Sequence, residues 1–296
     1  MKLFVTETYY SCVEKAAEYI AKTGVGIDSP AVVFCEDKLT LSAESAIAKA
    51  MGGGSFGVDV VSLGRYVSKR LKDSSALSKE GSAIVVKKVL SENADNLKTL
   101  SRLAFSPSFA FETSELIAQL KSAKITPEML MNSVDGCLEN IRAKILDLAV
   151  VFKGYEDFLK KKGLTDQSGI LGKMPELIEK DEKLRKSRAI VVGFSSVTRQ
   201  SAEAIKKLVE TCRHVDFFAV DGENLSLYSN EFSSFVSRTF GLEKIRLNGG
   251  ESLEQKALLN GLFDHEQFTK VGLYSDKLTI YESHSVQEEA EYAALN

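Results

Sequence analysis

The segment at residues 3–20 has the arrangement that holds phosphate groups in many α/β proteins. Residues 3–5 predict a short buried strand, and the residues from Ser11 onward predict an amphipathic helix. A helix that directly follows a strand offers unpaired N–H groups and a positive dipole end to an anion. The turn between them, residues 6–10, has no glycine to curl around a phosphate and no lysine to reach it.

The side chains of this turn also argue against phosphate binding. Glu7 adds a negative charge, and Tyr9 and Tyr10 add two bulky rings. Ser11 followed by Glu14 fits a capping box, in which a helix satisfies its first N–H groups with its own side chains. We therefore expect the scaffold of a phosphate site with no working phosphate site in it.

Two further stretches resemble reactive loops but have simpler interpretations. A glycine triplet at residues 52–54 follows a predicted helix rather than a strand, so it predicts a helix end and a connector. Ser195 and Ser196 follow a predicted strand but lack the second glycine of a nucleophile elbow. We interpret the two serines as a cap or a turn.

Candidate metal ligands are few and scattered. Asp216, Asp221 and Glu223 gather near one predicted strand end, where they would either bind a cation or form a solvated acidic turn, and we favour the turn. The four cysteines and three histidines lie far apart, with no Cys-x-x-Cys pair. We expect no metal site, no cofactor and no disulfide.

The composition is that of a soluble globular protein with room for two domains. The chain has 296 residues, of which 44% are hydrophobic and 27% charged. No apolar run reaches the ~18 residues that span a bilayer, and no signal peptide precedes the first strand, so we expect a cytoplasmic protein without membrane contact. The net charge of -3 means that any contact with nucleic acid must come from a local basic patch.

Apolar runs that alternate with helical periodicity predict an α/β fold with a doubly wound parallel sheet. Buried strands are also predicted at residues 31–35, 58–61, 189–192, 215–220 and 278–281. From residue 78 to about residue 186 every segment is helical, which predicts an inserted all-helical domain. We place the core at residues 1–75 and 187–277, the insertion at 76–186, and the start of a second, truncated domain of a longer protein at 278–296.

The longest predicted helix, residues 138–162, belongs to this insertion. Its apolar residues recur at intervals of four and three, which predicts one narrow seam packed on neighbouring helices. The seam consists of Ile141, Ile145, Leu148, Phe152, Tyr155 and Leu159.

A basic helix follows the strand at residues 58–61 directly. Ser62 is its predicted cap, and Arg65, Lys69 and Arg70 follow. Such a helix either contacts the phosphates of a nucleic acid or presents an ordinary solvated face.

The strand after the helical excursion bears on nucleotide hydrolysis. In nucleotide hydrolases of this build, that strand ends in acidic residues that hold magnesium. Here it ends in Val192-Gly193-Phe194, without a carboxylate. Because the first turn also lacks its phosphate-binding residues, we expect a domain that does not hydrolyse nucleotides.

Three motifs resemble those of one family. Residues 31–44, with Glu36, Thr40 and Glu44, are similar to a strand followed by Pro-Glu-Gln-x-Thr-x-x-x-Glu, although Cys35 and Asp37 replace the proline and the glutamine. Residues 61–66 are similar to Leu-Ser-Phe-x-Arg-Leu, and residues 192–200 to Asp-Gly-Phe-x-x-Phe-Thr-Pro-x-Glu. In these motifs and their order, nearly the whole chain resembles the N-terminal part of the AddB subunit of bacterial AddAB helicase-nucleases, including the related RexB proteins.

The resemblance implies a RecA-like (P-loop NTPase-type) fold related to superfamily 1 helicases, and a role in processing broken DNA ends for recombinational repair. It implies single-stranded or end DNA and an AddA-like helicase-nuclease subunit as partners. The motif lysine of the phosphate loop would fall at Cys12. The implied degenerate nucleotide site comprises Thr6, Glu7, Ser11, Cys12 and Val13. The implied DNA-binding residues are Thr40, Ser62, Arg65, Lys69, Arg70, Thr198 and Gln200.

Three hypotheses for function remain at this point. The first is a catalytically silent, helicase-like scaffold that guides single-stranded DNA and docks the motor subunit. The second is a protein-interaction domain without DNA contact. The third and least favoured is an active nucleotide hydrolase with an unfamiliar loop.

Overall fold

The computed structural model describes residues 1–71, 76–222, 231–249 and 279–295. The chain divides into two compact units. The first contains residues 1–222 and 227–249, and the second contains residues 223–226 and 250–296. Within the described residues, no helix is long and apolar enough to cross a bilayer.

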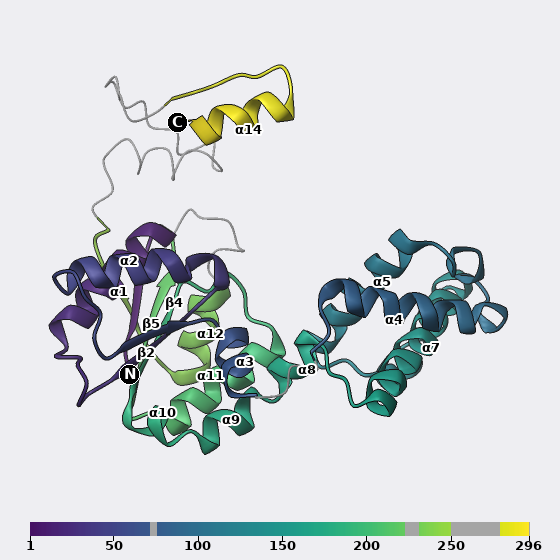
Figure 1. Ribbon diagram of the computed structural model, residues 1–296, viewed down its shortest axis with the longest axis horizontal. Helices are drawn as coiled ribbons and strands as arrows, with labels where there is room; N and C mark the ends of the chain where they lie inside the picture. The colour runs from purple at the N-terminus through teal and green to yellow at the C-terminus, as the bar shows by residue number, and fades with distance from the viewer. Residues whose placement is uncertain (72–75, 223–230, 250–278, 296) are drawn as a thin grey trace. The chain divides into compact units, whose positions relative to one another are not determined.

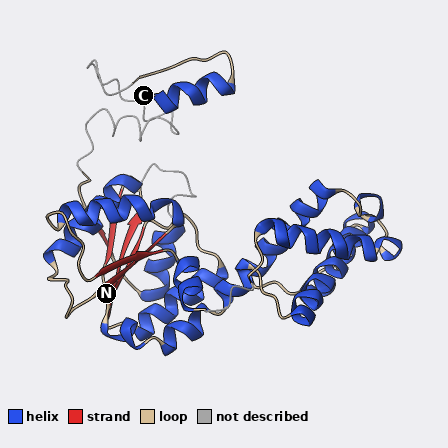
Figure 2. Ribbon diagram, in the orientation of Figure 1, coloured by secondary structure: helices blue, strands red, loops and turns tan. Residues whose placement is uncertain are grey.

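A six-stranded, all-parallel sheet forms the centre of the first unit (Figure 2). Its strands are β1 (Leu3–Thr6), β2 (Ala31–Cys35), β3 (Val58–Val61), β4 (Arg188–Val192), β5 (His214–Val220) and β6 (Lys244–Arg246). They lie in the order β3-β2-β4-β5-β1-β6. The predicted parallel α/β sheet is confirmed, and it is consistent with a RecA-like fold.

Helices cover both faces of this sheet (Figure 1). One face is covered by α1 (Tyr9–Lys22) and α2 (Thr40–Ala50), and the other by α3 (Leu63–Arg70), α11 (Arg199–Thr211) and α12 (Glu231–Phe240). Because side chains alternate along a strand, Leu3 and Phe217 belong to the core under α11 and α12, whereas their neighbours Phe4 and Phe218 contact Tyr19 of α1. Strands β1, β2, β4 and β5 are therefore buried on both faces, as their continuous apolar runs predict.

In the described residues, seven α-helices lie between α3 and β4. They are α4 (Lys79–Glu92), α5 (Pro107–Ser122), α6 (Pro127–Asn132), α7 (Glu139–Lys162), α8 (Gln167–Gly172), α9 (Met174–Lys180) and α10 (Glu182–Lys186). An apolar cluster of its own joins α4, α5 and α7. The helical periodicity of this region is confirmed, while its status as a separate inserted domain stays a prediction.

The predicted seam of α7 is buried along only part of its length. Phe152, Tyr155 and Leu159 are buried, whereas Ile141 near the start of the helix is 45% exposed. In the middle of the helix the buried Asp147 accepts hydrogen bonds from the backbone N–H groups of residues 98–100. The prediction of one continuous packed seam is therefore wrong at the N-terminal end of α7.

Two local predictions need correction and one is confirmed. Helix α1 begins at Tyr9, with Thr8 as its N-cap, so the predicted capping box at Ser11 is wrong. Helix α2 ends at Ala50, before the glycine triplet, and the N–H of Gly53 donates to the carbonyl of Ala48 as a C-terminal cap should. Of the strand predicted at residues 278–281, residues 279–281 are described and are not a strand.

A buried carboxylate stabilises the start of β5. Asp216 is fully buried and accepts hydrogen bonds from the Tyr19 hydroxyl at 2.8 Å, the Lys2 backbone N–H at 3.0 Å and the Arg188 guanidinium at 3.2 Å. His214 Nε2 lies 2.9 Å from the same carboxylate. Asp216 thus joins β4, β5, α1 and the chain that enters β1.

Replacing this carboxylate should destabilise the fold strongly. We expect Asp216→Ala to lower the free energy of unfolding by about 3 kcal/mol, because it leaves the Arg188 charge and the Tyr19 hydroxyl without their buried acceptor. Urea unfolding followed by circular dichroism measures the difference. Asp28→Ala, on an exposed turn, is the control and should change stability by less than about 0.5 kcal/mol. Equal stability of the two variants would contradict this role of Asp216.

Candidate functional site

The turn between β1 and α1 is closed by its own polar groups. The Thr8 side chain accepts a hydrogen bond from the Ser11 N–H at 3.1 Å, and the Thr8 carbonyl accepts from the Cys12 N–H at 2.9 Å. The Ser11 and Thr6 hydroxyls also donate to the Thr8 carbonyl. The N–H groups of Ser11 and Cys12, in the first turn of α1, are therefore occupied by local partners. The absence of a working phosphate site here stays a prediction.

Cys12, at the position implied for the motif lysine, is fully buried. Burial raises the pKa of its thiol to about 12. Hydrogen bonds with the Thr6 side chain and the Gly193 backbone lower this pKa, but burial outweighs them. Thr6, Ser11 and Val13 are buried as well, and Glu7 is half-buried. At neutral pH the position of Cys12 therefore carries a neutral thiol, whereas a phosphate loop has a cation there.

Bulky side chains fill the space beside this turn. Gly193, directly after β4, has a left-handed φ of 67°, and a Cβ added there would lie 2.7 Å from Leu39 Cδ1 and 3.7 Å from the Tyr9 ring. Glycine is needed at this position for its backbone angle and for this close approach. The loops after β1, β2 and β4 thus meet through apolar contacts.

Glu36 and Ser195 form the polar part of this junction. One oxygen of the Glu36 carboxylate, Oε1, accepts from the Ser195 N–H at 2.6 Å and from the Ser195 hydroxyl at 2.5 Å. The other oxygen, Oε2, lies 2.9 Å from the Lys38 ammonium, which in turn lies over the Tyr9 ring. Burial would raise the pKa of Glu36, but the hydrogen bonds from Ser195 and Lys38 outweigh burial and lower it below its ordinary value.

The candidate acids for a cation site do not come together. Asp216 lies in the first half of β5 and is paired with Arg188, whereas Asp221 follows the last residue of the strand. Asp221 is buried and accepts from the Ser233 hydroxyl and from Lys244, with Arg246 3.5 Å away. Both acids are buried and paired, so the predicted solvated acidic turn is wrong for them, and Glu223 lies outside the described residues. In the part of the chain that the structure describes, no group of three potential metal ligands occurs.

The residues with predicted DNA contacts meet partly around Asp37, after β2. The Asp37 carboxylate accepts from the Ser62 hydroxyl at 2.8 Å and pairs with Arg65 at 3.2 Å, and the Asp37 carbonyl accepts from the Thr40 hydroxyl. Ser62 is the N-cap of α3, as predicted. Thr40 and Ser62 are buried, so Arg65 is the exposed member of this group, with 62% of its side chain accessible.

Lys69 and Arg70, at the end of α3, have different surroundings. Lys69 is 58% exposed and pairs with the exposed Asp59 at 3.5 Å. Arg70 stacks on the Tyr66 ring at 3.6 Å and pairs with the partly buried Asp181 at 2.5 Å. Arg70 therefore ties α3 to the start of α10.

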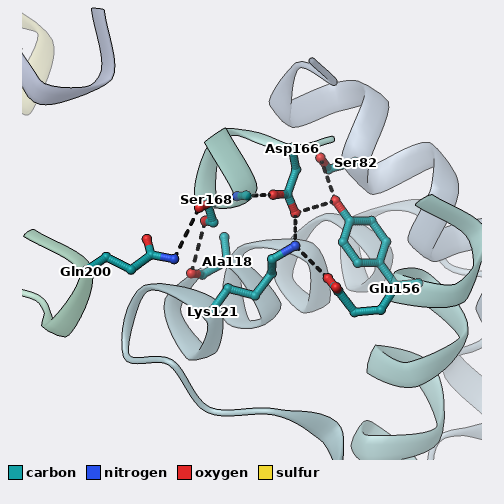
Figure 3. A network of polar contacts seen from close by, with 9 residues as sticks. Ser82, Ala118, Lys121, Glu156, Asp166, Ser168 and Gln200 are labelled. Atoms are coloured by element: carbon teal, nitrogen blue, oxygen red, sulfur yellow. Dashed lines mark hydrogen bonds and ion pairs between the residues drawn. The ribbon is translucent and has the colours of Figure 1, made fainter. Parts of the chain in front are cut away.

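The remaining two predicted residues lie on α11. Thr198 is the N-cap of this helix and accepts from the Ser201 N–H. Gln200 is buried, and its side-chain amide donates to the Ser168 carbonyl of α8 at 3.2 Å (Figure 3). Ser168 borders a network in which Lys121 pairs with both Asp166 and Glu156 (Figure 3). Gln200 thus connects α11 to the helices between β3 and β4.

The sequence did not predict the interaction partners of the Glu36, Asp37 and Asp181 carboxylates. Glu36 follows β2 directly and Ser195 lies in the loop after β4, and the ends of neighbouring parallel strands meet at one edge of the sheet. The order of the strands, which makes β2 and β4 neighbours, is not visible in the sequence. Asp181 gives no signal at all, because its partner Arg70 is remote along the chain.

Comparison with known proteins identifies the family. A family model described as "ADDB, N-terminal" matches residues 10–248. The chain belongs to this family. It is 25% identical over 239 residues to the B subunit of the ATP-dependent helicase/deoxyribonuclease of Listeria innocua, an alignment that covers 77% of this chain and 21% of that protein.

Two further relatives align with similar identity and coverage. The corresponding B subunit of Natranaerobius thermophilus is 26% identical over 196 residues, which covers 63% of this chain and 16% of that protein. The one of Listeria monocytogenes is 24% identical over 239 residues, which covers 77% of this chain and 21% of that protein. The chain therefore spans about a fifth of the length of the curated relatives that it matches.

Removing the charge of Asp181 should weaken the fold in a pH-dependent way. Burial raises the pKa of Asp181, but hydrogen bonds from Tyr66, the Leu184 N–H and Arg70 outweigh burial and lower it. A lowered carboxyl pKa contributes stability above the unfolded-state pKa of about 4, and this contribution is lost as the pH falls through the folded-state value. We expect Asp181→Asn to lower the free energy of unfolding by about 2 kcal/mol at pH 7.

The difference from the wild type should shrink when urea unfolding is repeated below pH 4. Asp59→Asn, which removes the acid of an exposed ion pair, is the control and should lower stability by less than about 1 kcal/mol at pH 7. A deficit of Asp181→Asn that stays constant between pH 7 and pH 3 would contradict this interpretation.

Proposed function

We propose that this chain is a non-hydrolysing, helicase-like N-terminal segment of a bacterial helicase-nuclease subunit that acts on broken DNA ends in the cytoplasm. In this proposal it guides single-stranded DNA and docks an AddA-like motor subunit. The proposal rests on one observation: in this member of the ADDB family, side chains fill the edge of the sheet where the strands have their carboxyl ends. Cys12 is buried where the motif lysine would stand, and Tyr9, Leu39 and Glu36 lie beside it.

DNA guidance would depend on the exposed cations of α3. The ion pairs of Arg65 with Asp37 and of Lys69 with Asp59 are solvent-exposed, and such pairs contribute only about 0–1 kcal/mol. A DNA phosphate can therefore compete for either cation at little expense in folding stability. Thr40, Arg70, Thr198 and Gln200 make internal contacts, so our proposal assigns them to holding this surface rather than to touching DNA.

We also propose the domain organisation that the sequence predicts. Residues 1–75 and 187–277 would form a discontinuous RecA-like core, residues 76–186 an inserted helical domain, and residues 278–296 the start of a second domain. The separate apolar cluster of α4, α5 and α7 supports the insertion. In the alternative function, a scaffold without DNA contact, the exposed Leu138 and Ile141 of this helical region would contact a partner protein.

Removing two α3 cations should weaken DNA binding. We expect Arg65→Ala combined with Lys69→Ala to weaken binding of a fluorescent oligothymidine about tenfold at 50 mM salt, because two phosphates are no longer neutralised. Fluorescence anisotropy at several salt concentrations should also show a shallower salt dependence, by about 0.7 in the logarithmic slope for each of these phosphates.

The matched control removes two other exposed, ion-paired lysines. Lys79→Ala combined with Lys88→Ala changes the net charge equally, and both lysines pair with glutamates on the helical segment. We expect this control to bind the oligonucleotide like the wild type. No binding by the wild type at low salt would favour the scaffold alternative, and equal losses in both double variants would contradict a specific role of α3.

The nucleotide site should be inactive. We expect the purified chain to hydrolyse no Mg-ATP above the background rate, with or without single-stranded DNA. The reason is that the turn at residues 6–10 has neither the glycines nor the lysine of a phosphate-binding loop, and residues 192–194 at the end of β4 include no carboxylate. A coupled phosphate-release assay measures this rate. DNA-stimulated hydrolysis that is lost in Ser11→Ala would overturn the proposal of a silent domain.

A further inference from the structure

We infer that Glu36 occupies a phosphate-binding site of this chain, formed by the Ser195 N–H, the Ser195 hydroxyl and the Lys38 ammonium. The site lies at the carboxyl ends of the neighbouring strands β2 and β4. A phosphate group competes with the Glu36 carboxylate for these three donors. This inference goes beyond the proposed function, which assigns no ligand to this edge of the sheet.

The topology of the sheet makes this edge a usual place for a ligand. Strands β2 and β4 are neighbours, with Cys35 opposite Val192. The chain leaves β2 through α2 on one face of the sheet and leaves β4 through α11 on the other face (Figure 1). Open α/β sheets bind ligands in the crevice outside the strand ends where successive connections diverge in this way.

The hydrogen-bond donors around the Glu36 carboxylate are of the kinds that bind anions. A backbone N–H and a hydroxyl from Ser195 converge on one oxygen at 2.6 Å and 2.5 Å, and the Lys38 ammonium lies 2.9 Å from the second oxygen. Such charge-assisted donors bind carboxylates and phosphates alike. The lowered pKa of Glu36 agrees with a set of donors that stabilises negative charge.

The Glu36 and Lys38 side chains are accessible enough for a phosphate to replace the Glu36 carboxylate. The Glu36 side chain is 21% exposed and that of Lys38 is 62% exposed. The Lys38 ammonium can therefore turn to an incoming phosphate without unfolding its surroundings. The Tyr9 ring, 5.5 Å from this ammonium, forms one wall of the site.

The decisive variant removes the internal ligand. We expect Glu36→Ala to bind inorganic phosphate at least tenfold more tightly than the wild type, measured by the shift of the Ser195 amide resonance in NMR titrations. Adding Lys38→Ala to Glu36→Ala should abolish this gain. Glu44→Ala, which removes an exposed acid of α2, makes the same change of net charge and should leave phosphate binding at the wild-type level.

A second variant keeps the test valid if Glu36→Ala does not fold. Glu36→Gln retains an oxygen that accepts from Ser195 but removes the competing charge, so it should bind phosphate more tightly than Glu44→Ala. Circular dichroism establishes that each variant is folded. A folded Glu36→Ala or Glu36→Gln protein whose phosphate binding equals that of Glu44→Ala would overturn the inference, as would a gain that persists without Lys38.

A second titration on the same variants distinguishes between two sources of the phosphate group, a DNA backbone and a free phosphate or nucleotide. If the group comes from a DNA backbone, oligothymidine should displace inorganic phosphate from Glu36→Ala and shift the same Ser195 amide. If it comes from a free phosphate or a nucleotide, pyrophosphate should do so and oligothymidine should not. Both results support the site. Failure of the proposed DNA guidance is recognised separately, because that test uses Arg65 and Lys69 with Glu36 intact.

Discussion

The pairing of β4 between β2 and β5 is the constraint on which the rest of this structure depends. After the long helical excursion the chain returns to the centre of the sheet, where Val191 lies opposite Phe34 on one side and Phe217 on the other. This register places the loop after β4 beside the loop after β2. The contacts between these two loops, from the close approach at Gly193 to the bonds between Glu36 and Ser195, follow from that placement.

The regular elements were accessible from the sequence because burial leaves a strong pattern. A strand covered on both faces is a continuous apolar run, and β2, β4 and β5 were recognisable in this way. Strand β6 was not, because it is a short edge strand whose Lys244 and Arg246 side chains interrupt any apolar run. The start of α1 was misplaced for a similar reason. Thr8 and Ser11 are both good caps, and only the backbone angles of Thr8 decide between them.

The candidate site was less accessible, because the role of a side chain depends on a partner that the sequence does not name. Arg65 and Arg70 lie on the same helix and have the same chemistry. Arg70 is held by a partly buried carboxylate and an aromatic ring, whereas the pair of Arg65 with Asp37 is exposed to solvent. Removing one partner of a buried pair costs about 3–5 kcal/mol, against at most about 1 kcal/mol for an exposed pair. This difference decides which arginine can turn to a ligand.

The same reasoning applies to our proposal that the nucleotide site is inactive while the fold is retained. An empty phosphate loop leaves N–H groups unpaired and relies on a bound nucleotide for part of its stability. Here Thr8 accepts from the N–H groups of Ser11 and Cys12 after β1, and the Glu36 carboxylate accepts from the N–H and the hydroxyl of Ser195 after β4. In the proposed silent domain, these side chains of the same chain would take the place of a ligand, so the edge of the sheet would not depend on a nucleotide for its stability. The arrangement of strands and loops therefore remains available for binding other partners.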